Sequence, residues 1–417
     1  MIPSNASLIA QLIADGLIRS PQVEAAFRAL PRANFAPPDT PIEWIYRDDV
    51  IPIKQEGEIW VSTITNPGGI ANMLERLQIE PGMRILEIGA ASGYTAALLA
   101  HLVGENGHVT SVEIDPDLAQ MARRNLDAHG LQRVEVAHFD GSLGYPKNAP
   151  YDRILLTVGA WDIPTAWREQ LTPNGLLLVS LWVRSVQRSF LFRRTATGLV
   201  AQGAQAMSFV RMRGQAAGGE GKTRFGPEHL FYAETDSRNT THGESLYSLL
   251  QQTPQQHRIG IRLCAAEVLN GLVFYLAAHL PNFGSIGARR ELMQQNLIAG
   301  MPGLSHRHSE TAGLLTPNAL CLLHCPPEQN PLTTRTDLPD LYRNLVDFDL
   351  HLRTHGAQPQ TLTTALRQAI EQWQAAARPT DASLRAEVTF GDDAPPTSPR
   401  AVTLHKPSSR LTLQWES

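Results

Sequence analysis

The stretch RILEIGAASGYTAALL, residues 84–99, decides the fold that this sequence predicts. An apolar strand pattern runs into a turn that contains Gly89 and Gly93, and a helix-forming segment follows at once. Glycine lets a turn adopt otherwise strained angles and approach a ligand closely, while the amino end of the helix offers free N–H groups. A dinucleotide-binding turn has the pattern G-x-G-x-x-G. Counting from Gly89, the second and third glycine positions hold Ala91 and Tyr94, which argues against a bound pyrophosphate.

From residue 83 to residue 183, strand and helix patterns alternate regularly, and this turn lies near the start of that range. Such alternation predicts a doubly wound, Rossmann-like α/β domain with a parallel sheet and helices on both faces. The segment 189–205 has the pattern of a hairpin that continues the sheet at one edge. Strands are expected at 84–89, 108–115, 134–141, 151–159 and 175–183, and helices at 92–103, 116–130 and 163–171.

Acidic residues lie at the ends of the first three predicted strands: Glu87, Glu113 and Asp140, the last followed by Gly141. An acid at the position of Glu113 can accept both ribose hydroxyls of an adenosine. Asp140 and the loop after it can meet the adenine amino group, whereas Glu87 favours the cationic amino group and sulfonium of S-adenosylmethionine over a phosphate. Strands of such sheets also end in Gly and Asp for turn reasons alone. The three signals in register nevertheless favour an S-adenosylmethionine pocket.

Composition restricts the function class. The chain has 417 residues, a net charge of −4 and 42% hydrophobic residues, which predicts a globular protein of two domains. This charge gives no global basic field, so nucleic acid is not an expected partner. No apolar run approaches the ~18 residues of a membrane span, so we expect a cytoplasmic protein without a membrane contact. Three cysteines suit a reducing compartment.

The domain boundaries are expected as follows. Residues 1–80 form N-terminal helices and an acceptor-side segment, and residues 81–210 form the S-adenosylmethionine-binding core. Residues 211–230 are rich in glycine and small side chains at their start, which predicts a linker. Residues 231–417 mix strand and helix patterns and are expected to form an α+β domain.

Metal binding is not expected. Cys321, His324 and Cys325 could share a metal ion, but they lie in an apolar strand pattern without a second ligand cluster, which favours core packing. His306 and His308 are expected in a solvated loop rather than in a site.

Several segments together resemble the protein-L-isoaspartate O-methyltransferase family. They follow one another in order over residues 22–200: ALPRANFAP, YRDDVIPI, STITNP, LQIEPGMRILEIGAASGYTAALLAHLVGENGHVTSVEIDPDLAQMARRNL, VEVAHFDGSLGYPKNAPYDRILLTVGA and IPTAWREQLTPNGLLLV. The first three are the specific part, because many methyltransferases share the donor loop. The resemblance implies S-adenosylmethionine as the methyl donor, held by Glu87, Gly89, Gly93, Glu113, Asp140 and Gly141. It also implies an acceptor-side wall at Thr63 to Pro67, which includes Ile64 and Asn66.

The resemblance implies one residue that acts on the acceptor. Thr65 corresponds to a family serine that contacts the acceptor carboxylate, and a hydroxyl there could fix one oxygen while the other attacks the methyl group. The alternative is that Thr65 only caps the helix that begins near Pro67. Trp60 either lines the peptide site or makes an apolar contact under the loop. Asp48 and Asp49 either orient this loop, bind peptide N–H groups or lie in a solvated turn.

The chain departs from the family pattern at three points. Ala91 stands where the family has glycine, Thr65 replaces the serine, and nearly two hundred residues follow the methyltransferase core. Family members with such an extension occur beside lanthipeptide- and graspetide-type peptide-maturation genes. The resemblance therefore implies a carboxyl O-methyltransferase that acts on isoaspartyl or aspartyl side chains and is specialised for a ribosomally made precursor peptide, whose ester closes to a succinimide (aspartimide).

Other functions stay open at this point. One alternative is a general isoaspartate repair enzyme, and another is a small-molecule methyltransferase. A third is a binding protein that has lost catalysis, although the intact Gly89, Gly93, Glu113 and Asp140 speak against it. The oligomeric state is not predicted.

Overall fold

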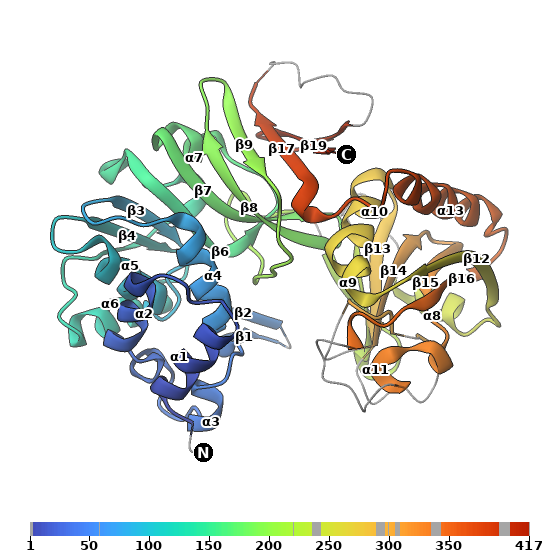
Figure 1. The fold of residues 1–417 in the computed structure, drawn as a ribbon, viewed down its shortest axis with the longest axis horizontal. Helices are drawn as coiled ribbons and strands as arrows, with labels where there is room; N and C mark the ends of the chain where they lie inside the picture. The colour runs from blue at the N-terminus through green and yellow to red at the C-terminus, as the bar shows by residue number, and fades with distance from the viewer. Residues whose placement is uncertain are drawn as a thin grey trace.

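The computed structural model describes residues 3–57, 59–219, 221–235, 243–288, 297–298, 300–304, 309–334, 343–391 and 401–416. The chain folds into two lobes, each built around one large sheet, and the second lobe lies beside the first (Figure 1). The sheets contain ten and seven strands, and a separate two-stranded hairpin belongs to the N-terminal region.

The N-terminal region is helical and packs against the first sheet. Ser20 caps its second helix by accepting the Val23 N–H, and Pro21 occupies the first helical position. A hairpin of antiparallel strands follows and leads directly into a helix that begins at Pro67. The elements are α1 (Asn5–Ala14), α2 (Pro21–Ala29), η1 (Arg32–Phe35), α3 (Ile42–Ile45), β1 (Ile51–Glu56), β2 (Ile59–Ile64) and α4 (Pro67–Leu77).

The first sheet has the predicted doubly wound order. Five parallel strands stand in the order β5-β4-β3-β6-β7, and the antiparallel strands β8 and β9 extend the sheet beyond β7. This confirms the predicted fold class. The elements are β3 (Arg84–Ile88), α5 (Tyr94–Val103), β4 (His108–Glu113), α6 (Pro116–Ala128), β5 (Glu135–His138), η2 (Gly141–Leu143), η3 (Pro146–Asn148), β6 (Tyr151–Ala160), α7 (Thr165–Glu169), β7 (Leu171–Val183), β8 (Val186–Arg194) and β9 (Gly198–Gln202).

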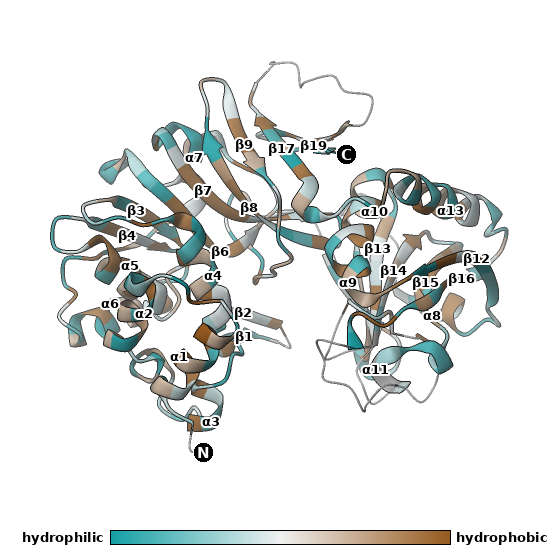
Figure 2. Cartoon of the chain, in the orientation of Figure 1, coloured by the Kyte–Doolittle hydropathy of each residue, from teal (hydrophilic) through white to brown (hydrophobic). Residues whose placement is uncertain are grey.

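Burial explains why these segments become strands and helices of one domain. The parallel strands are covered on both faces, so successive residues of β3 and of the second part of β7 are buried without alternation. Figure 2 shows hydrophobic segments along β7 and β8. Helix α5 is buried along nearly its whole length, which fits its alanine- and leucine-rich sequence.

The second lobe contains an antiparallel sheet with the order β10-β11-β13-β14-β15-β16-β12. Apolar helices pack on it, and the long helix α13 buries Leu366, Ile370 and Trp373. The elements are β10 (Gly221–Phe225), η4 (Pro227–His229), β11 (Phe231–Thr235), α8 (Gly243–Leu250), β12 (Gln255–Leu263), α9 (Ala265–Glu267), η5 (Val268–Leu272), α10 (Val273–His279), β13 (Phe283–Ala288), β14 (Ser309–Leu315), β15 (Ala319–His324), η7 (Pro327–Gln329), α11 (Pro331–Thr334), β16 (Phe348–Gly356) and α13 (Gln360–Ala375).

The C-terminal strands differ from the expected division at residue 231. After η8 (Asp381–Ser383), strands β17 (Leu384–Thr389), β18 (Ala401–His405) and β19 (Arg410–Trp415) return to the first lobe, where β17 pairs with β9. An exposed edge at β9 would leave a row of backbone groups unpaired, and β17 removes that edge. The expected linker at 211–230 is also shorter than predicted, because β10 is a strand of the second sheet.

Two arginines of the first lobe bind the second. Arg188 on β8 forms an ion pair with Asp381 (Nε to Oδ2, 2.5 Å), and both side chains are 4% exposed. The same guanidinium donates to the Leu269 carbonyl in the second lobe. Arg184 donates to the Ala278 carbonyl (3.1 Å) near the end of α10. These contacts fix the lobes against each other.

Two other expectations concern cysteine and histidine residues. Cys321 and Cys325 belong to the main apolar core, and His324 between them is 2% exposed. The expected loop at His306 and His308 lies outside the described residues. Among the helices that the structure describes, none is long and apolar enough to cross a membrane.

Candidate active site

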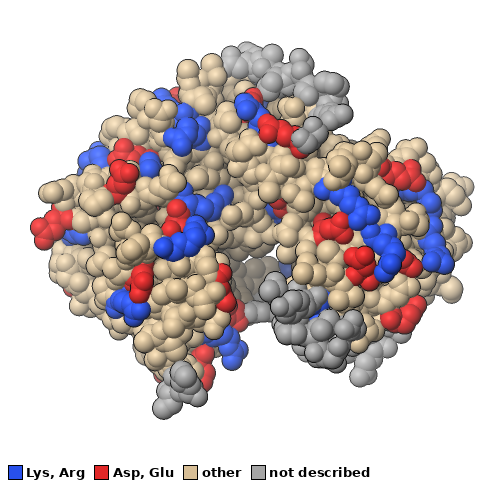
Figure 3. Space-filling model, in the orientation of Figure 1, with Lys and Arg blue, Asp and Glu red and all other residues tan. Residues whose placement is uncertain are grey.

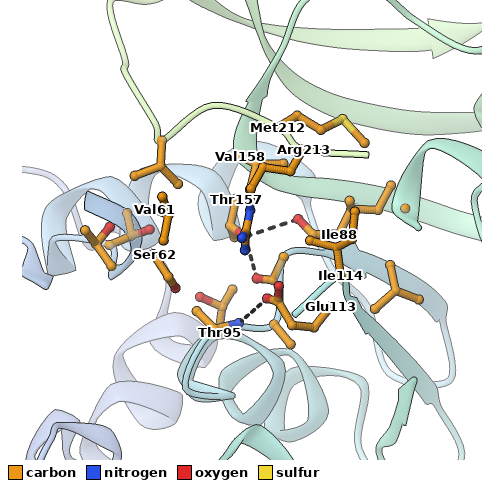
Figure 4. Close-up of a pocket in the computed structure, with 18 of the residues that line it drawn as sticks. Val61, Ser62, Ile88, Thr95, Glu113, Ile114, Thr157, Val158, Met212 and Arg213 are labelled. Carbon is orange, nitrogen blue, oxygen red and sulfur yellow. Dashed lines mark hydrogen bonds between the residues drawn. The ribbon is translucent and has the colours of Figure 1, made fainter. Parts of the chain in front are cut away.

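A cavity of about 690 Å³ opens where the parallel strands end, beside the point where the strand order reverses. Ligands of open α/β sheets bind at this position. Figure 4 shows Val61 and Ser62 of the hairpin on one side, with Glu113 and Ile114 across from them. The residues that line the cavity are Val61–Thr65, Ile88–Ser92, Tyr94, Thr95, Val112–Ile114, Phe139, Gly141, Thr157, Val158 and Val210–Arg213.

Two glycines form part of its wall. Gly89 has a φ of 104°, and a Cβ added to it would lie 2.5 Å from Thr157 Oγ1. That hydroxyl donates to the Gly89 carbonyl (2.6 Å), which ties the end of β3 to β6. A Cβ at Gly141 would lie 2.3 Å from Ile88 Cγ2. Both positions need glycine because a side chain has no room.

Glu113 ends β4 and faces the cavity. Its Oε2 accepts the Ala91 N–H (3.0 Å) and its Oε1 accepts the Asp115 N–H (3.1 Å). The carboxylate is thus held by two backbone donors while the residue stays 6% exposed. Ala91 adopts a φ of 48°, a left-handed conformation that favours glycine. A fixed carboxylate at a strand end suits a ribose.

Three expected donor contacts lie elsewhere. Glu87 is fully buried and does not line the cavity: Ser111 Oγ donates to its Oε2 (2.5 Å). Burial raises the pKa of Glu87 to about 8, opposed by the Ser111 hydrogen bond and aided by the charge of Glu113. Gly93 has a φ of 83° at the start of α5, and a Cβ there would lie 3.1 Å from the Ala122 carbonyl. Asp140 accepts the Gln215 N–H (2.8 Å) beside the cavity rather than in its lining.

Some of the residues predicted for the acceptor-side segment line the cavity and others do not. Thr63, Ile64 and Thr65 line the cavity. Asn66 does not, because its side chain donates to Asp48 Oδ1 (2.9 Å). Trp60 lies on β2 with 39% of its surface exposed and is outside the lining.

Asp48 supplies the cap that the sequence left open. Its Oδ1 also accepts the Gly68 N–H (2.7 Å) in the first turn of α4, so this carboxylate orients the loop. Within the described residues, Thr65 Oγ1 has no hydrogen-bond partner, and helix α4 is capped without it.

A buried arginine holds the acceptor-side segment in place. The Arg32 guanidinium is fully buried and donates to the carbonyls of Ile64 (3.2 Å) and Thr65 (3.0 Å). It also donates to the carbonyl of Asp49 (2.8 Å) and to those of two residues of the preceding turn. Burial lowers the pKa of Arg32 to about 10. The sequence contains this residue in ALPRANFAP, but an arginine between alanine and proline carries no signal of its partners.

A strap covers the cavity, formed by residues 210–215, where the sequence predicts a linker. Gly159 N–H donates to the Val210 carbonyl (2.8 Å), and the Met212 N–H donates back to Gly159 (2.9 Å). Arg213 lies 3.7 Å from Asp115 and 3.4 Å from Glu56. Figure 4 shows Met212 and Arg213 on the side of the cavity near Val158. Glycine-rich composition did not reveal this role, because the strap binds through its backbone.

The cavity suits S-adenosylmethionine. Ser92 Oγ lines it and is buried without a hydrogen-bond partner in the described part of the chain, so a ligand group can satisfy it. Glu113 offers a carboxylate, and Gly89 and Gly141 allow close approach of the backbone. Fold and cavity together define an S-adenosylmethionine-dependent methyltransferase.

Comparison with known proteins narrows the class. The model of the protein-L-isoaspartate(D-aspartate) O-methyltransferase family matches residues 3–217, more than half of the chain. The chain belongs to this family and is an S-adenosylmethionine-dependent protein carboxyl O-methyltransferase.

Individual relatives support this placement. The protein-L-isoaspartate O-methyltransferase of Methanopyrus kandleri is 42% identical over 192 residues, which cover 46% of this chain and 82% of that protein. The Hyperthermus butylicus enzyme of the same name is 39% identical over 201 residues, covering 46% and 81%. A solved protein-L-isoaspartate O-methyltransferase structure aligns with a TM-score of 0.51 at 22% identity, over 93% of this chain and 97% of that one. This last likeness concerns the fold alone, and it reaches into the second lobe.

Proposed function

We propose that the protein transfers a methyl group to the free carboxylate of L-isoaspartyl residues in proteins or peptides, as a repair reaction. The observation that carries this proposal is the position of Thr63, Ile64 and Thr65, which face the donor cavity from the acceptor side. Two hydroxyl side chains and no titratable group come from this segment, which suits an acceptor that is already ionised.

The donor side is held by residues that the structure fixes. Glu113 binds the ribose hydroxyls, and Gly89 and Gly141 admit the donor close to the backbone. When bound, S-adenosylmethionine supplies a methyl group activated by its sulfonium. The strap excludes water above the cavity through Met212 and Arg213.

Thr65 positions the acceptor. The free carboxylate of the acceptor is already ionised near neutral pH, so methyl transfer to it needs no general base. Thr65 Oγ1 donates to one carboxylate oxygen and leaves the other aimed at the methyl group. Arg32 keeps the Thr65 backbone in place through its carbonyl (3.0 Å). Orientation of this kind contributes up to about 7–11 kcal/mol.

The ester then reacts without the enzyme. The backbone nitrogen that follows the modified residue displaces methanol and closes a succinimide, which water reopens in part to normal aspartate.

Specialisation for a ribosomally made precursor is a second candidate. It is favoured by the second lobe, which the N-terminal family match does not include. In that case the acceptor is an aspartyl side chain of the precursor, and the succinimide (aspartimide) is the product.

The experiment uses the full chain, S-adenosylmethionine and two peptides that differ only in an isoaspartyl or aspartyl linkage. Repair predicts that mass spectrometry finds a methyl group and then a succinimide on the isoaspartyl peptide alone. Methylation of the aspartyl peptide alone supports the dedicated enzyme. Methylation of neither peptide, while calorimetry shows donor binding, contradicts the repair proposal. A Glu113→Ala variant serves as the control without a ribose ligand.

A further inference from the structure

A second cavity lies between the lobes, where Figure 3 shows a hollow in the molecular surface. It has a volume of about 1210 Å³. Trp182 and Arg188 line it from the first lobe, and Glu234, Ser285 and Glu310 line it from the second. We call it the interlobe cleft.

A thin wall separates this cleft from the donor cavity. Arg211 lines the donor cavity, and its guanidinium carbon lies 4.7 Å from the centre of the Trp182 ring. Its Nη2 lies 3.8 Å from Glu234 Oε1. Trp182 and Glu234 belong to the cleft, so one side chain touches both spaces. A polypeptide bound at the donor cavity therefore has the cleft beside it.

Two carboxylates, those of Glu234 and Glu310, line the cleft. Glu234 on β11 has Lys222 at 3.4 Å in addition to Arg211. Glu310 on β14 accepts the Tyr232 hydroxyl (3.0 Å). Tyr232 reaches it across β13 because Gly287 has no side chain: a Cβ there would lie 2.4 Å from the Tyr232 hydroxyl.

Glu310 lacks a cation of its own. No lysine, arginine or histidine nitrogen of the described residues lies within 4.0 Å of its carboxylate. Burial and the charge of Glu234 raise the pKa of Glu310 to about 7, against the opposing effects of the Tyr232 and Ser285 hydroxyls and of the Lys222 charge. A second charge beside a buried acid is unfavourable unless a cation joins them.

Ser285 lies beside Glu310, and its hydroxyl lowers the pKa of that carboxyl. Ser285 is 4% exposed and lines the cleft from β13, between β11 and β14. Its Oγ is buried, and it finds no partner with hydrogen-bond geometry in the part of the chain described. Buried hydroxyls normally have partners, so the cleft offers an acceptor as well as negative charge.

We propose that the interlobe cleft binds a lysine or arginine side chain of the polypeptide substrate, at a fixed separation from the carboxylate that is methylated. The cation lies between Glu310 and Glu234, and Ser285 Oγ accepts one of its N–H groups. This inference rests on the proposed function and adds a selection of substrate sequence to it. The second lobe is then part of the substrate site.

The test measures methyl transfer to isoaspartyl peptides that are identical except for one lysine, placed in turn at each position on either side of the isoaspartyl residue. In each matched control peptide, glutamine replaces that lysine. At one position we expect kcat/KM to be about 10-fold higher for lysine than for glutamine, the effect of one partly desolvated ion pair. The Glu310→Gln variant loses this preference, and Glu244→Gln, an exposed acid on α8, retains it.

Folding is checked separately. The comparison of lysine and glutamine peptides uses the unaltered protein, so it does not depend on the folding of any variant. Glu234→Gln is a second variant, and it weakens the same preference for lysine. Equal rates for lysine and glutamine at every position overturn this inference while leaving the proposed function intact. A preference that survives in both Glu310→Gln and Glu234→Gln also overturns it. Absence of methyl transfer to every peptide contradicts the proposed function and this inference together.

Discussion

At the scale of single residues, Ala91 has a backbone conformation that is unfavourable for a residue with a side chain. Its φ of 48° lies in the left-handed region, and its N–H donates to Glu113 in the donor cavity. The hydrogen bond therefore holds a strained residue against the carboxylate that we assign to the ribose.

Replacement of Ala91 by glycine tests that strain. We expect Ala91→Gly to raise the free energy of unfolding by about 1 kcal/mol, because glycine adopts this conformation without a steric cost. Ala100→Gly, in the buried helix α5, is the matched control and lowers it by about 1 kcal/mol or more. Urea unfolding of both variants measures the difference. A loss of stability in Ala91→Gly contradicts the assignment of strain.

Glu87 predicts a pH dependence. Its pKa is about 8 in the folded protein, raised by burial from 4.5. Between these values the folded state keeps a proton that the unfolded state has lost, so stability falls as the pH rises from about 4.5 to 8. Glu87→Gln carries no such proton. We expect its stability relative to the unaltered protein to increase across this window, by about 5 kcal/mol in total.

Denaturant unfolding at several pH values provides the measurement. The exposed Glu80→Gln is the control and follows the unaltered protein at every pH. A constant offset between Glu87→Gln and the unaltered protein from pH 5 to pH 8 argues against a buried, protonated Glu87.

The sequence predicts donor-binding residues from their positions along strands, and position alone does not fix where each side chain points. Gly89, Glu113 and Gly141 line the cavity as expected. Glu87 precedes Ile88, the last residue of β3, which lines the cavity, and the side chains of adjacent strand residues point to opposite faces of the sheet. It therefore turns away from the cavity toward Ser111. Trp60 and Asn66 were placed by their closeness to Thr65 in the chain, which does not fix where their side chains point.

At the scale of elements, the acceptor-side segment depends on Arg32 and Asp48. The Arg32 guanidinium donates hydrogen bonds to five backbone carbonyls of separate segments. The Asp48 carboxylate caps α4. The segment that faces the donor is therefore positioned by residues that precede it by up to 33 positions in the chain. No local pattern encodes such contacts.

Removal of the Arg32 guanidinium leaves these carbonyls without donors. We expect Arg32→Met to lower the free energy of unfolding by about 3 kcal/mol and to raise KM for the peptide, because the Thr65 backbone is released. Arg28→Met changes a side chain that is 52% exposed and stays within about 0.5 kcal/mol. Equal effects of the two substitutions would mean that Arg32 is not a structural clamp.

The strap shows a related limit of the sequence. The sequence predicts that residues 211–215 of the strap belong to a linker, because the stretch is rich in glycine and small residues, yet the strap binds Gly159, Asp115 and Asp140. A segment that is held over a ligand site by backbone hydrogen bonds needs no periodic spacing of apolar residues and no helix-capping residues. Its sequence therefore does not reveal its position.

At the scale of the whole molecule, the C-terminal strands unite the two lobes. The sequence predicts two units in succession and does not reveal that strands of residues 231–417 pair with the first sheet. Alternation in a strand specifies a buried face and leaves the neighbouring strand undetermined. The pairing of β17 with β9 is therefore a feature that only the structure reveals.

The buried pair of Arg188 and Asp381 tests this union. Asp381→Asn leaves the Arg188 charge buried without its counterion, and we expect a loss of about 3–5 kcal/mol in unfolding free energy. A double variant with Arg188→Met loses less than the sum of the single losses, because the two residues interact. The surface ion pair of Glu24 and Arg28 is the control: Glu24→Gln changes the free energy of unfolding by less than about 1 kcal/mol. Additive losses in the double variant contradict a coupled pair.

The central claim is that Thr65 presents an isoaspartyl carboxylate to the methyl donor, and one kinetic comparison tests it most directly. The rate of methyl transfer to an isoaspartyl peptide is measured for the unaltered protein, Thr65→Ser and Thr65→Val, with donor affinity measured for each by calorimetry. The account predicts that serine stays close to the unaltered protein, whereas valine lowers kcat/KM by about 10–100-fold through loss of a hydrogen bond to a charged group. Donor affinity is the same in all three. Equal methylation by Thr65→Val and Thr65→Ser would contradict the account.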